Sequence, residues 1–163
     1  MHFYENDAAF ERLWRAPERY LPILKRFEGV IAPDFSLYRD MPLVMQQWNI
    51  YRSHAIAHWL QENDISVLAN VRWGDRRTFD LCCAGVPKNA TFAVGSHGCI
   101  KLLREREYFK RGLEYAVNQL SPRTIIVYGT TPDEIFGRYK DGGIRILQFD
   151  SECEVAHRKE VGA

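Results

Sequence analysis

Residues 91–128 read TFAVGSHGCIKLLREREYFKRGLEYAVNQLSPRTIIVY and decide the fold class. Thr91–Ser96 and Thr124–Tyr128 are short runs rich in β-branched and aromatic residues, apolar on both faces, as strands buried in a parallel sheet are. Between them, Arg104–Leu120 places apolar residues on one face at helical spacing, and Ser121-Pro122 ends the helix. A strand, a helix and a second strand in this order predict two parallel strands joined by a right-handed crossover.

The same alternation extends through the chain. Four further runs rich in Val, Ile, Phe and Tyr are predicted strands: His2–Tyr4, Val30–Phe35, Ser66–Trp73 and Ile144–Phe149. Four further segments are predicted helices: Ala8–Phe27 (broken or redirected at Pro17 and Pro22, with Asp7 as N-cap), Pro42–Glu62, Asp75–Cys83 and Pro132–Tyr139. Strict alternation predicts an α/β fold with a mainly parallel sheet and helices packed on it. An open three-layer sandwich and a partial barrel both fit, because both bury their strands on two faces.

The longest predicted helix carries an apolar stripe. The stripe consists of residues that recur at steps of three and four: Val44, Trp48, Tyr51, Ala55 and Trp59. This spacing is typical of an amphipathic helix. A fully buried stripe would argue for core packing, whereas exposed Trp side chains would support a surface that binds another protein.

Composition and charge describe an ordinary globular chain. The 163 residues are 46% hydrophobic and 26% charged, without repeats or linkers, so we expect a single α/β domain over residues 1–163. The formal net charge of +1 gives no global electrostatic case for nucleic acid or an anionic membrane. The chain has no apolar run near the roughly 20 residues of a membrane helix and no signal-peptide pattern at its start, so we expect a cytoplasmic location.

In parallel α/β folds a ligand binds beyond the carboxyl ends of the strands. The predicted ligand-binding residues lie after predicted strands or beside these positions: Asp34, Ser36, Tyr38, Arg52, Arg72, Trp73, Asp75, Ser96 and Tyr128. The carboxylates would bind hydroxyls or a metal, the aromatic rings would stack, and an Arg would contact a phosphate. For each residue taken singly, a helix cap or turn is the alternative interpretation.

Three other kinds of site have weaker patterns. Gly95–Cys99 reads GSHGC, in which Ser96 or Cys99 with His97 resembles a nucleophile and its base, but the loop matches neither glycine-rich nucleotide motif and a simple turn is the alternative. His54 and His58 have the spacing of two metal ligands but lack the Glu of H-E-x-x-H, so half-buried surface histidines are the alternative. A Mg²⁺ site would need at least two of the aspartates that follow strands to converge: Asp7, Asp34, Asp40, Asp75 and Asp150.

The cysteines form no C-x-x-C pair and are expected to be reduced: Cys82, Cys83, Cys99 and Cys153.

Four segments resemble one known family. They are Pro33–Pro42 (PDFSLYRDMP), Gln47–Arg52 (QWNIYR), Val71–Asp75 (VRWGD) and Gly85–Lys88 (GVPK). Together they resemble the domain-of-unknown-function 4417 family, and the similarity extends from about His2 to Tyr128. The resemblance implies a protein of bacteria, phages or mobile elements and implies no particular activity. The shared segments follow the second and third predicted strands, whereas the two histidines of the long helix are not part of the family's pattern. The resemblance therefore favours the strand ends over the histidine pair, and it supports no catalytic histidine in the GSHGC loop.

Three functions follow as hypotheses, with catalytic residues and cofactor unassigned. The first is a phage or mobile-element protein that binds a nucleotide or phosphorylated small molecule at its strand ends. The second is a nucleic-acid-processing or replication accessory factor that uses clustered aspartates and a divalent metal such as Mg²⁺. The third is a non-enzymatic protein that blocks a host factor through an aromatic surface.

Overall fold

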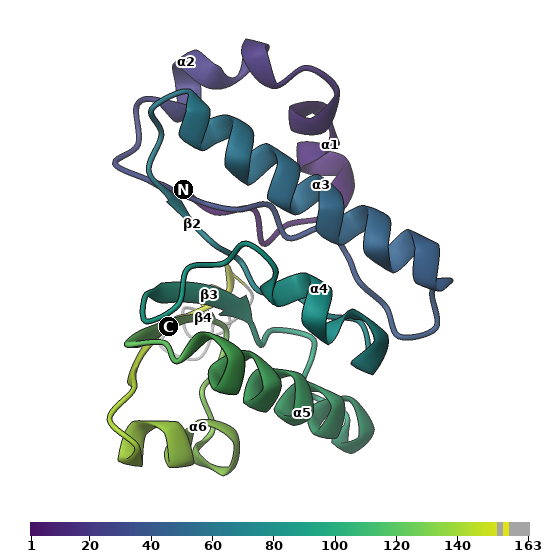
Figure 1. The fold of residues 1–163 in the computed structure, drawn as a ribbon, viewed down its shortest axis with the longest axis vertical. Coiled ribbons are helices and arrows are strands. Elements are labelled where there is room, and N and C mark those ends of the chain that lie inside the picture. Colours follow the sequence, from purple (N-terminus) through teal and green to yellow (C-terminus); the bar gives the residue numbers. More distant parts are fainter. Residues whose placement is uncertain (153–154, 157–163) are drawn as a thin grey trace. The chain divides into compact units, whose positions relative to one another are not determined.

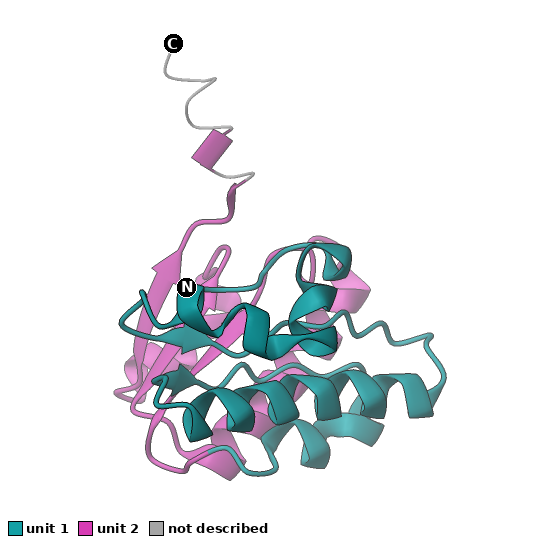
Figure 2. Cartoon of the chain, turned by 90° about the horizontal axis from the view of Figure 1, so that it is seen from above, with its two compact units in different colours: residues 1–86 teal, residues 87–163 magenta. Residues whose placement is uncertain are grey.

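A computed structural model describes residues 1–152 and 155–156 of the chain. It contains two compact units, Met1–Val86 and Pro87–Ala163, which we call unit 1 and unit 2 (Figure 2). Each unit combines helices with its own parallel sheet (Figure 1). Cys153 lies outside the described residues, and the other three cysteines are free thiols. That residues 1–163 form a single domain stays a prediction.

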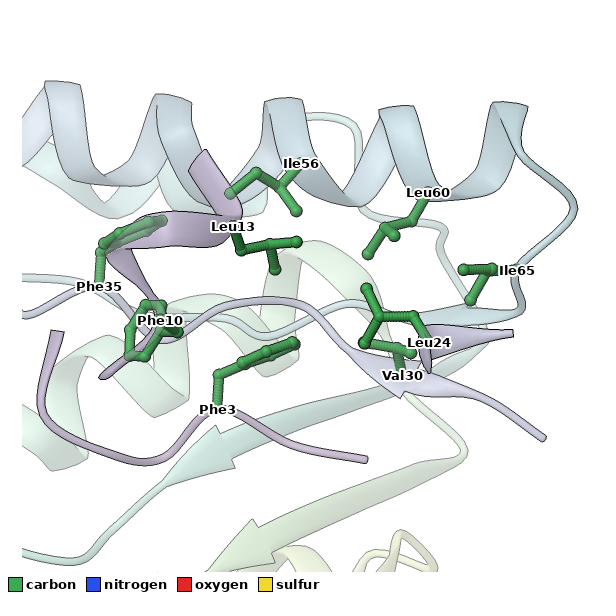
Figure 3. Close-up of a cluster of buried hydrophobic side chains, with 9 residues drawn as sticks. All are labelled: Phe3, Phe10, Leu13, Leu24, Val30, Phe35, Ile56, Leu60 and Ile65. Atoms are coloured by element: carbon green, nitrogen blue, oxygen red, sulfur yellow. The ribbon is translucent and has the colours of Figure 1, made fainter. Parts of the chain in front are cut away.

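Unit 1 is built on two short parallel strands. Its elements, in chain order, are α1 (Asp7–Arg15), η1 (Pro17–Arg19), α2 (Leu21–Leu24), β1 (Val30–Ile31), α3 (Leu43–Glu62), β2 (Val67–Leu68), η2 (Arg76–Thr78) and α4 (Phe79–Cys83). Val30 pairs with Val67, and Ile31 pairs with Leu68. Apolar side chains from α1, α2, α3, β1 and the segments beside them form the core (Figure 3): Phe3, Phe10, Leu13, Leu24, Val30, Phe35, Ile56, Leu60 and Ile65. Burying each large side chain contributes about 1.5–3 kcal/mol, so this cluster holds the helices to the short strands.

Unit 2 has a three-stranded parallel sheet in the order β3-β4-β5. Its elements are β3 (Thr91–Gly95), α5 (Leu103–Leu120), β4 (Thr124–Tyr128), α6 (Asp133–Asp141) and β5 (Arg145–Phe149). Thr91 pairs with Thr124, which pairs with Arg145 on its other side. The Phe109 and Phe136 ring centroids lie 6.1 Å apart, which joins α5 to α6. Because the two helices contact each other, they cover the same face of the sheet.

The predicted fold class is confirmed: strands and helices alternate and all strand pairs are parallel. The strands belong to two separate open sheets, and several are shorter than predicted. Val30–Phe35 forms a strand only at Val30–Ile31, because Pro33 has no N–H to continue the ladder. Ser66–Trp73 forms a strand only at Val67–Leu68, opposite this short partner.

Two further local predictions were wrong. His2–Tyr4 is not a strand, although the Met1 carbonyl accepts a hydrogen bond from the Ile31 amide at 2.9 Å. Asn6, not Asp7, caps α1, and its side chain accepts a hydrogen bond from the Ala8 amide. The predicted break at Pro17 is confirmed, because α1 ends before this residue, whereas Pro22 breaks no helix and lies in the first turn of α2.

In the described part of the chain, no helix has both the length and the apolar character needed to cross a bilayer.

Candidate functional site

Polar side chains converge beyond the ends of β1 and β2 in unit 1. Asn70 Nδ2 donates to Asp34 Oδ1 at 2.7 Å, and the Arg72 guanidinium donates to Asp34 Oδ2 at 3.2 Å. The Tyr4 hydroxyl donates to Asn70 Oδ1 at 2.9 Å. Side chains that follow two neighbouring parallel strands are thus joined, as expected at the carboxyl edge of a parallel sheet.

The inner face of α3 is polar along its first half, which explains how the adjacent segment is held. Residues 33–41 run as an irregular chain whose buried carbonyls need hydrogen-bond donors. Ser53 Oγ donates to the Pro33 carbonyl at 2.6 Å, and Asn49 Nδ2 donates to the Ser36 carbonyl at 2.6 Å. Gln46 Nε2 donates to the Met41 carbonyl at 3.0 Å. Because these donors face inward, the predicted apolar stripe at Val44, Trp48 and Tyr51 faces outward and is exposed.

A hollow opens between α3 and the strand ends. Its cavity volume is about 10 Å³, which is room for about one water-sized group, and it is lined by Pro33, Phe35, Leu37, Asn49, Ile50, Ser53, His54, Asn70 and Arg72. Sites that enclose a drug-sized ligand usually measure about 300–1,000 Å³, so a larger molecule would place only a small polar group here and keep its body outside.

His54 forms part of the wall of this hollow. Burial lowers its pKa below the ordinary value, so the imidazole is neutral at pH 7. No hydrogen bond joins its side chain to another residue that the structure describes. A neutral imidazole offers one donor and one acceptor.

Two predicted site residues near the hollow have structural partners. The Ser36 amide and hydroxyl both donate to the Asp7 carboxylate, at 3.1 and 2.8 Å. The buried Arg52 guanidinium donates to Glu11 at 2.7 Å and to Asn49 Oδ1 at 2.6 Å. It also lies 3.8 Å from the centroid of the Phe35 ring. Arg52 thus ties α1 to α3, and a role in ligand binding stays a prediction for both residues.

The other predicted residues of unit 1 have different surroundings. The Tyr38 ring is exposed, whereas the Trp73 ring is buried edge-on against Phe79 at 6.4 Å. Asp75 caps η2 by accepting from the Arg77 amide at 2.9 Å and pairs with the Arg77 guanidinium at 2.6 Å. The hydrogen bond from the Arg77 side chain lowers the pKa of Asp75 to about 2. Their roles in stacking and ligand binding stay predictions.

Ser96 and Tyr128 lie in unit 2 and hold the ends of β3 and β4 together. The Ser96 side chain is fully buried, and its hydroxyl donates to the Thr130 carbonyl at 2.7 Å. The Ser96 amide donates to the Tyr128 carbonyl at 2.9 Å. The Ser96 hydroxyl therefore has a structural hydrogen-bond partner. No described hydrogen bond joins it to His97, the base that the sequence suggested, and the His97 ring instead meets the Tyr128 ring edge-on at 6.4 Å.

Among the described residues, no group of three or more His, Cys, Asp or Glu side chains is placed to hold a metal ion. Sequence reasoning missed Tyr4, Asn49, Ser53 and Asn70, and it considered His54 only as a metal ligand. The spacing of polar residues along the predicted helix could have revealed Asn49 and Ser53. Gln46, Asn49 and Ser53 recur at steps of three and four, opposite the apolar stripe, as a buried polar face of the helix would.

Residues 1–150 match the model of a family described as Domain of unknown function (DUF4417). The chain belongs to this family. The resemblance inferred from four segments is thereby confirmed, and the DUF4417 match also covers the strands of unit 2.

Curated relatives of this DUF4417 chain are phage proteins. It is 37% identical over 129 residues to the Gene 1 protein of Mycobacterium phage D29 and 35% identical over 129 residues to that of Mycobacterium phage L5. The aligned part is 79% of this chain but 48% and 56% of the two relatives, so the chain spans about half their length. No solved structure matches the chain. The expected phage association is confirmed in its relatives.

Proposed function

We propose that this chain binds a nucleotide or another phosphorylated small molecule at the hollow of unit 1. The observation that carries the proposal is the convergence of Asp34, Asn70 and Arg72 beyond two neighbouring parallel strands. Arg72 and Asn70 also line the hollow, so donors of both side chains are near any group that enters it.

The lining supports a ligand with one polar group inside the hollow and a larger body outside. Arg72 is the cation of the site, and a guanidinium binds phosphate oxygens in a planar, two-pronged geometry. Neutral His54 and the polar atoms of Asn49 and Ser53 can form hydrogen bonds with hydroxyl or amide groups of a ligand. Phe35 and Ile50 provide the apolar wall. The carboxylate of Asp34 holds Arg72 in place through the salt bridge at 3.2 Å.

The test is thermal unfolding of the full chain with nucleoside mono-, di- and triphosphates, cyclic nucleotides, nucleotide sugars and sugar phosphates. A ligand at a hundred times its Kd stabilises by about 2.7 kcal/mol, which raises Tm by several degrees. We expect a shift with at least one compound class in the wild-type chain. Arg72→Gln and His54→Gln should each remove most of it.

Matched controls lie in the same unit. Arg77→Gln changes an exposed Arg paired with Asp75, and His58→Gln changes an exposed His one turn further along α3. Both controls should keep the shift. A wild-type chain that responds to no compound, or a shift that survives in both hollow variants, would refute the proposal. Circular dichroism establishes that each variant is folded, and His54→Gln breaks no described hydrogen bond.

The two alternatives have unequal support. A metal-dependent nucleic-acid enzyme needs clustered aspartates, but the Asp34 carboxylate is bound by Asn70 and Arg72, and Asp75 by Arg77.

An interaction protein that blocks a host factor needs exposed aromatic side chains. Exposure of Trp48 and Tyr51 on α3 favours it as the second candidate. A defined host protein that bound the wild-type chain but not Tyr51→Lys would support this candidate, and equal binding by both would count against it.

A further inference from the structure

The outer face of α3 is apolar and exposed to solvent. Four large side chains on its first three turns have high exposed fractions: Val44 68%, Met45 49%, Trp48 46% and Tyr51 57%. Helix surfaces that face water usually carry charged and polar residues. Contiguous exposed apolar side chains of this size are typical of interaction sites.

Aromatic contacts order this face. The Trp48 and Tyr51 rings stack with centroids 5.6 Å apart and an interplanar angle of 23°. Trp14 of α1 meets both rings edge-on, at 5.3 Å from Trp48 and 6.2 Å from Tyr51. Because the rings already restrict one another, these side chains lose less conformational entropy when a partner binds to them.

Charge limits what can cover the face. α3 contains two charged residues, Arg52 and Glu62, of which Arg52 is buried and Glu62 is the last residue of the helix. The exposed positions before it carry no Asp, Glu, Lys or Arg: Val44, Met45, Gln47, Trp48, Tyr51, His58 and Gln61. The exposed positions of α3 before Glu62 thus offer no counter-charge to a nucleic acid or a highly charged protein, whereas two identical helix faces meet no repulsion. Trp, Tyr and Met with few charges are also the composition of interface cores, above all in homodimers.

We propose that this face joins two copies of the chain, with α3 of one copy packed against α3 of the other. Val44, Trp48 and Tyr51 are separated by four and three residues, so they form one ridge that can pack against a second helix. A two-fold axis brings the same ridge from the second copy, which makes the interface self-complementary. The surface is distinct from the hollow, because none of these three residues lines it, so the proposal does not depend on the proposed ligand.

The test is the mass of the purified full chain in solution, measured by sedimentation equilibrium over a wide range of concentration. We expect a concentration-dependent dimer of twice the 19.0 kDa chain mass. Trp48→Glu should weaken association at least about thirtyfold, because it places two like charges at the centre of a buried interface. Leu103→Glu is the matched control: Leu103 is 77% exposed at the start of α5, and this variant should dimerise like the wild type.

Two results would overturn the proposal. One is a wild-type chain that stays monomeric at every concentration, including a monomer that instead binds a host protein or a single-stranded oligonucleotide through this face. The other is a dimer that Trp48→Glu leaves intact. If Trp48→Glu does not fold, Tyr51→Lys tests the same surface, because the Tyr51 side chain is more exposed than that of Trp48. A Tyr51→Lys chain that is folded and dimerises as the wild type does refutes the proposal equally.

Discussion

At the scale of single residues, Gly129 permits the close approach of two chain segments in unit 2. Its φ is +109°, and a Cβ there would lie 2.6 Å from Ser96 Oγ and 2.7 Å from the His97 amide nitrogen. Gly129→Ala therefore combines backbone strain with a clash against backbone, and we expect a loss of at least about 3 kcal/mol in the free energy of unfolding. Gly143 also has positive φ, +86°, but open space around its Cβ position, so Gly143→Ala should cost only about 1 kcal/mol. Urea denaturation of the two variants measures the difference, and equal losses would contradict the structure.

Asp75 gives a pH dependence of defined sign. Its folded-state pKa is about 2 because the Arg77 side chain hydrogen-bonds the carboxylate, whereas the unfolded value is about 3.9. A depressed pKa stabilises the fold above about pH 4, and this contribution is lost as the pH falls from about 4 to about 2. Asp75→Asn keeps a cap acceptor but has no charge, so it should be less stable than the wild type at pH 7, and the difference should disappear as the pH falls through about 2. Urea denaturation of both proteins across this pH range provides the comparison; a difference that stays constant with pH would argue against the Asp75–Arg77 pair.

At the scale of elements, α3 is stabilised by polar groups where its pattern suggests apolar packing. Asn49 holds the Ser36 carbonyl and accepts from Arg52, both at 2.6 Å. Asn49→Leu would keep the number and branching of the side-chain heavy atoms but leave its hydrogen-bond partners unsatisfied, so we expect it to destabilise the fold by about 2 kcal/mol. Gln47→Leu, at an exposed position of the same helix, should change stability by less than about 0.5 kcal/mol. Chemical denaturation decides between them, and a neutral Asn49→Leu would show that the polar face of α3 does not hold the segment 33–41.

The sequence predicts those elements well in which local pattern and tertiary packing agree. Thr124–Tyr128 is a strand with the predicted bounds, and the predicted helix Arg104–Leu120 begins one residue earlier, at Leu103. Pattern and packing disagree in α3, because its partner is an irregular chain segment that needs hydrogen-bond donors rather than another apolar surface.

The candidate site could be predicted only in part, for a related reason. Asp34 and Arg72 lie at the carboxyl ends of predicted strands and were found, since the edge of a parallel sheet is a general place for ligands. Asn70 was missed, and His54 was considered only as a metal ligand. The place of Asn70 depends on where strand β2 ends, which does not follow from periodicity. The place of His54 depends on which face of α3 turns inward, for which the spacing of the buried polar residues is the only sequence signal.

At the scale of the whole molecule, the distribution of tryptophan allows a test of whether residues 1–163 unfold as one domain. All four tryptophans lie in unit 1: Trp14, Trp48, Trp59 and Trp73. Their fluorescence therefore reports on unit 1, whereas far-ultraviolet circular dichroism reports on helices of both units. The single-domain prediction requires both signals to change in one coincident transition.

A variant in one unit and a probe in the other make this test decisive. Gly129→Ala alters unit 2, which contains no tryptophan. If the chain unfolds as one cooperative domain, the loss of stability at Gly129 lowers the urea midpoint of the tryptophan fluorescence as much as that of the circular dichroism. If each unit unfolds by itself, the fluorescence midpoint stays at the wild-type value and only the circular dichroism shifts, because a destabilising substitution then acts only on the unit that contains it. Asn49→Leu is the reciprocal variant, since it lies in unit 1 and should move the fluorescence in either case. An unmoved fluorescence midpoint in Gly129→Ala, with a normal response in Asn49→Leu, would replace the single domain by two.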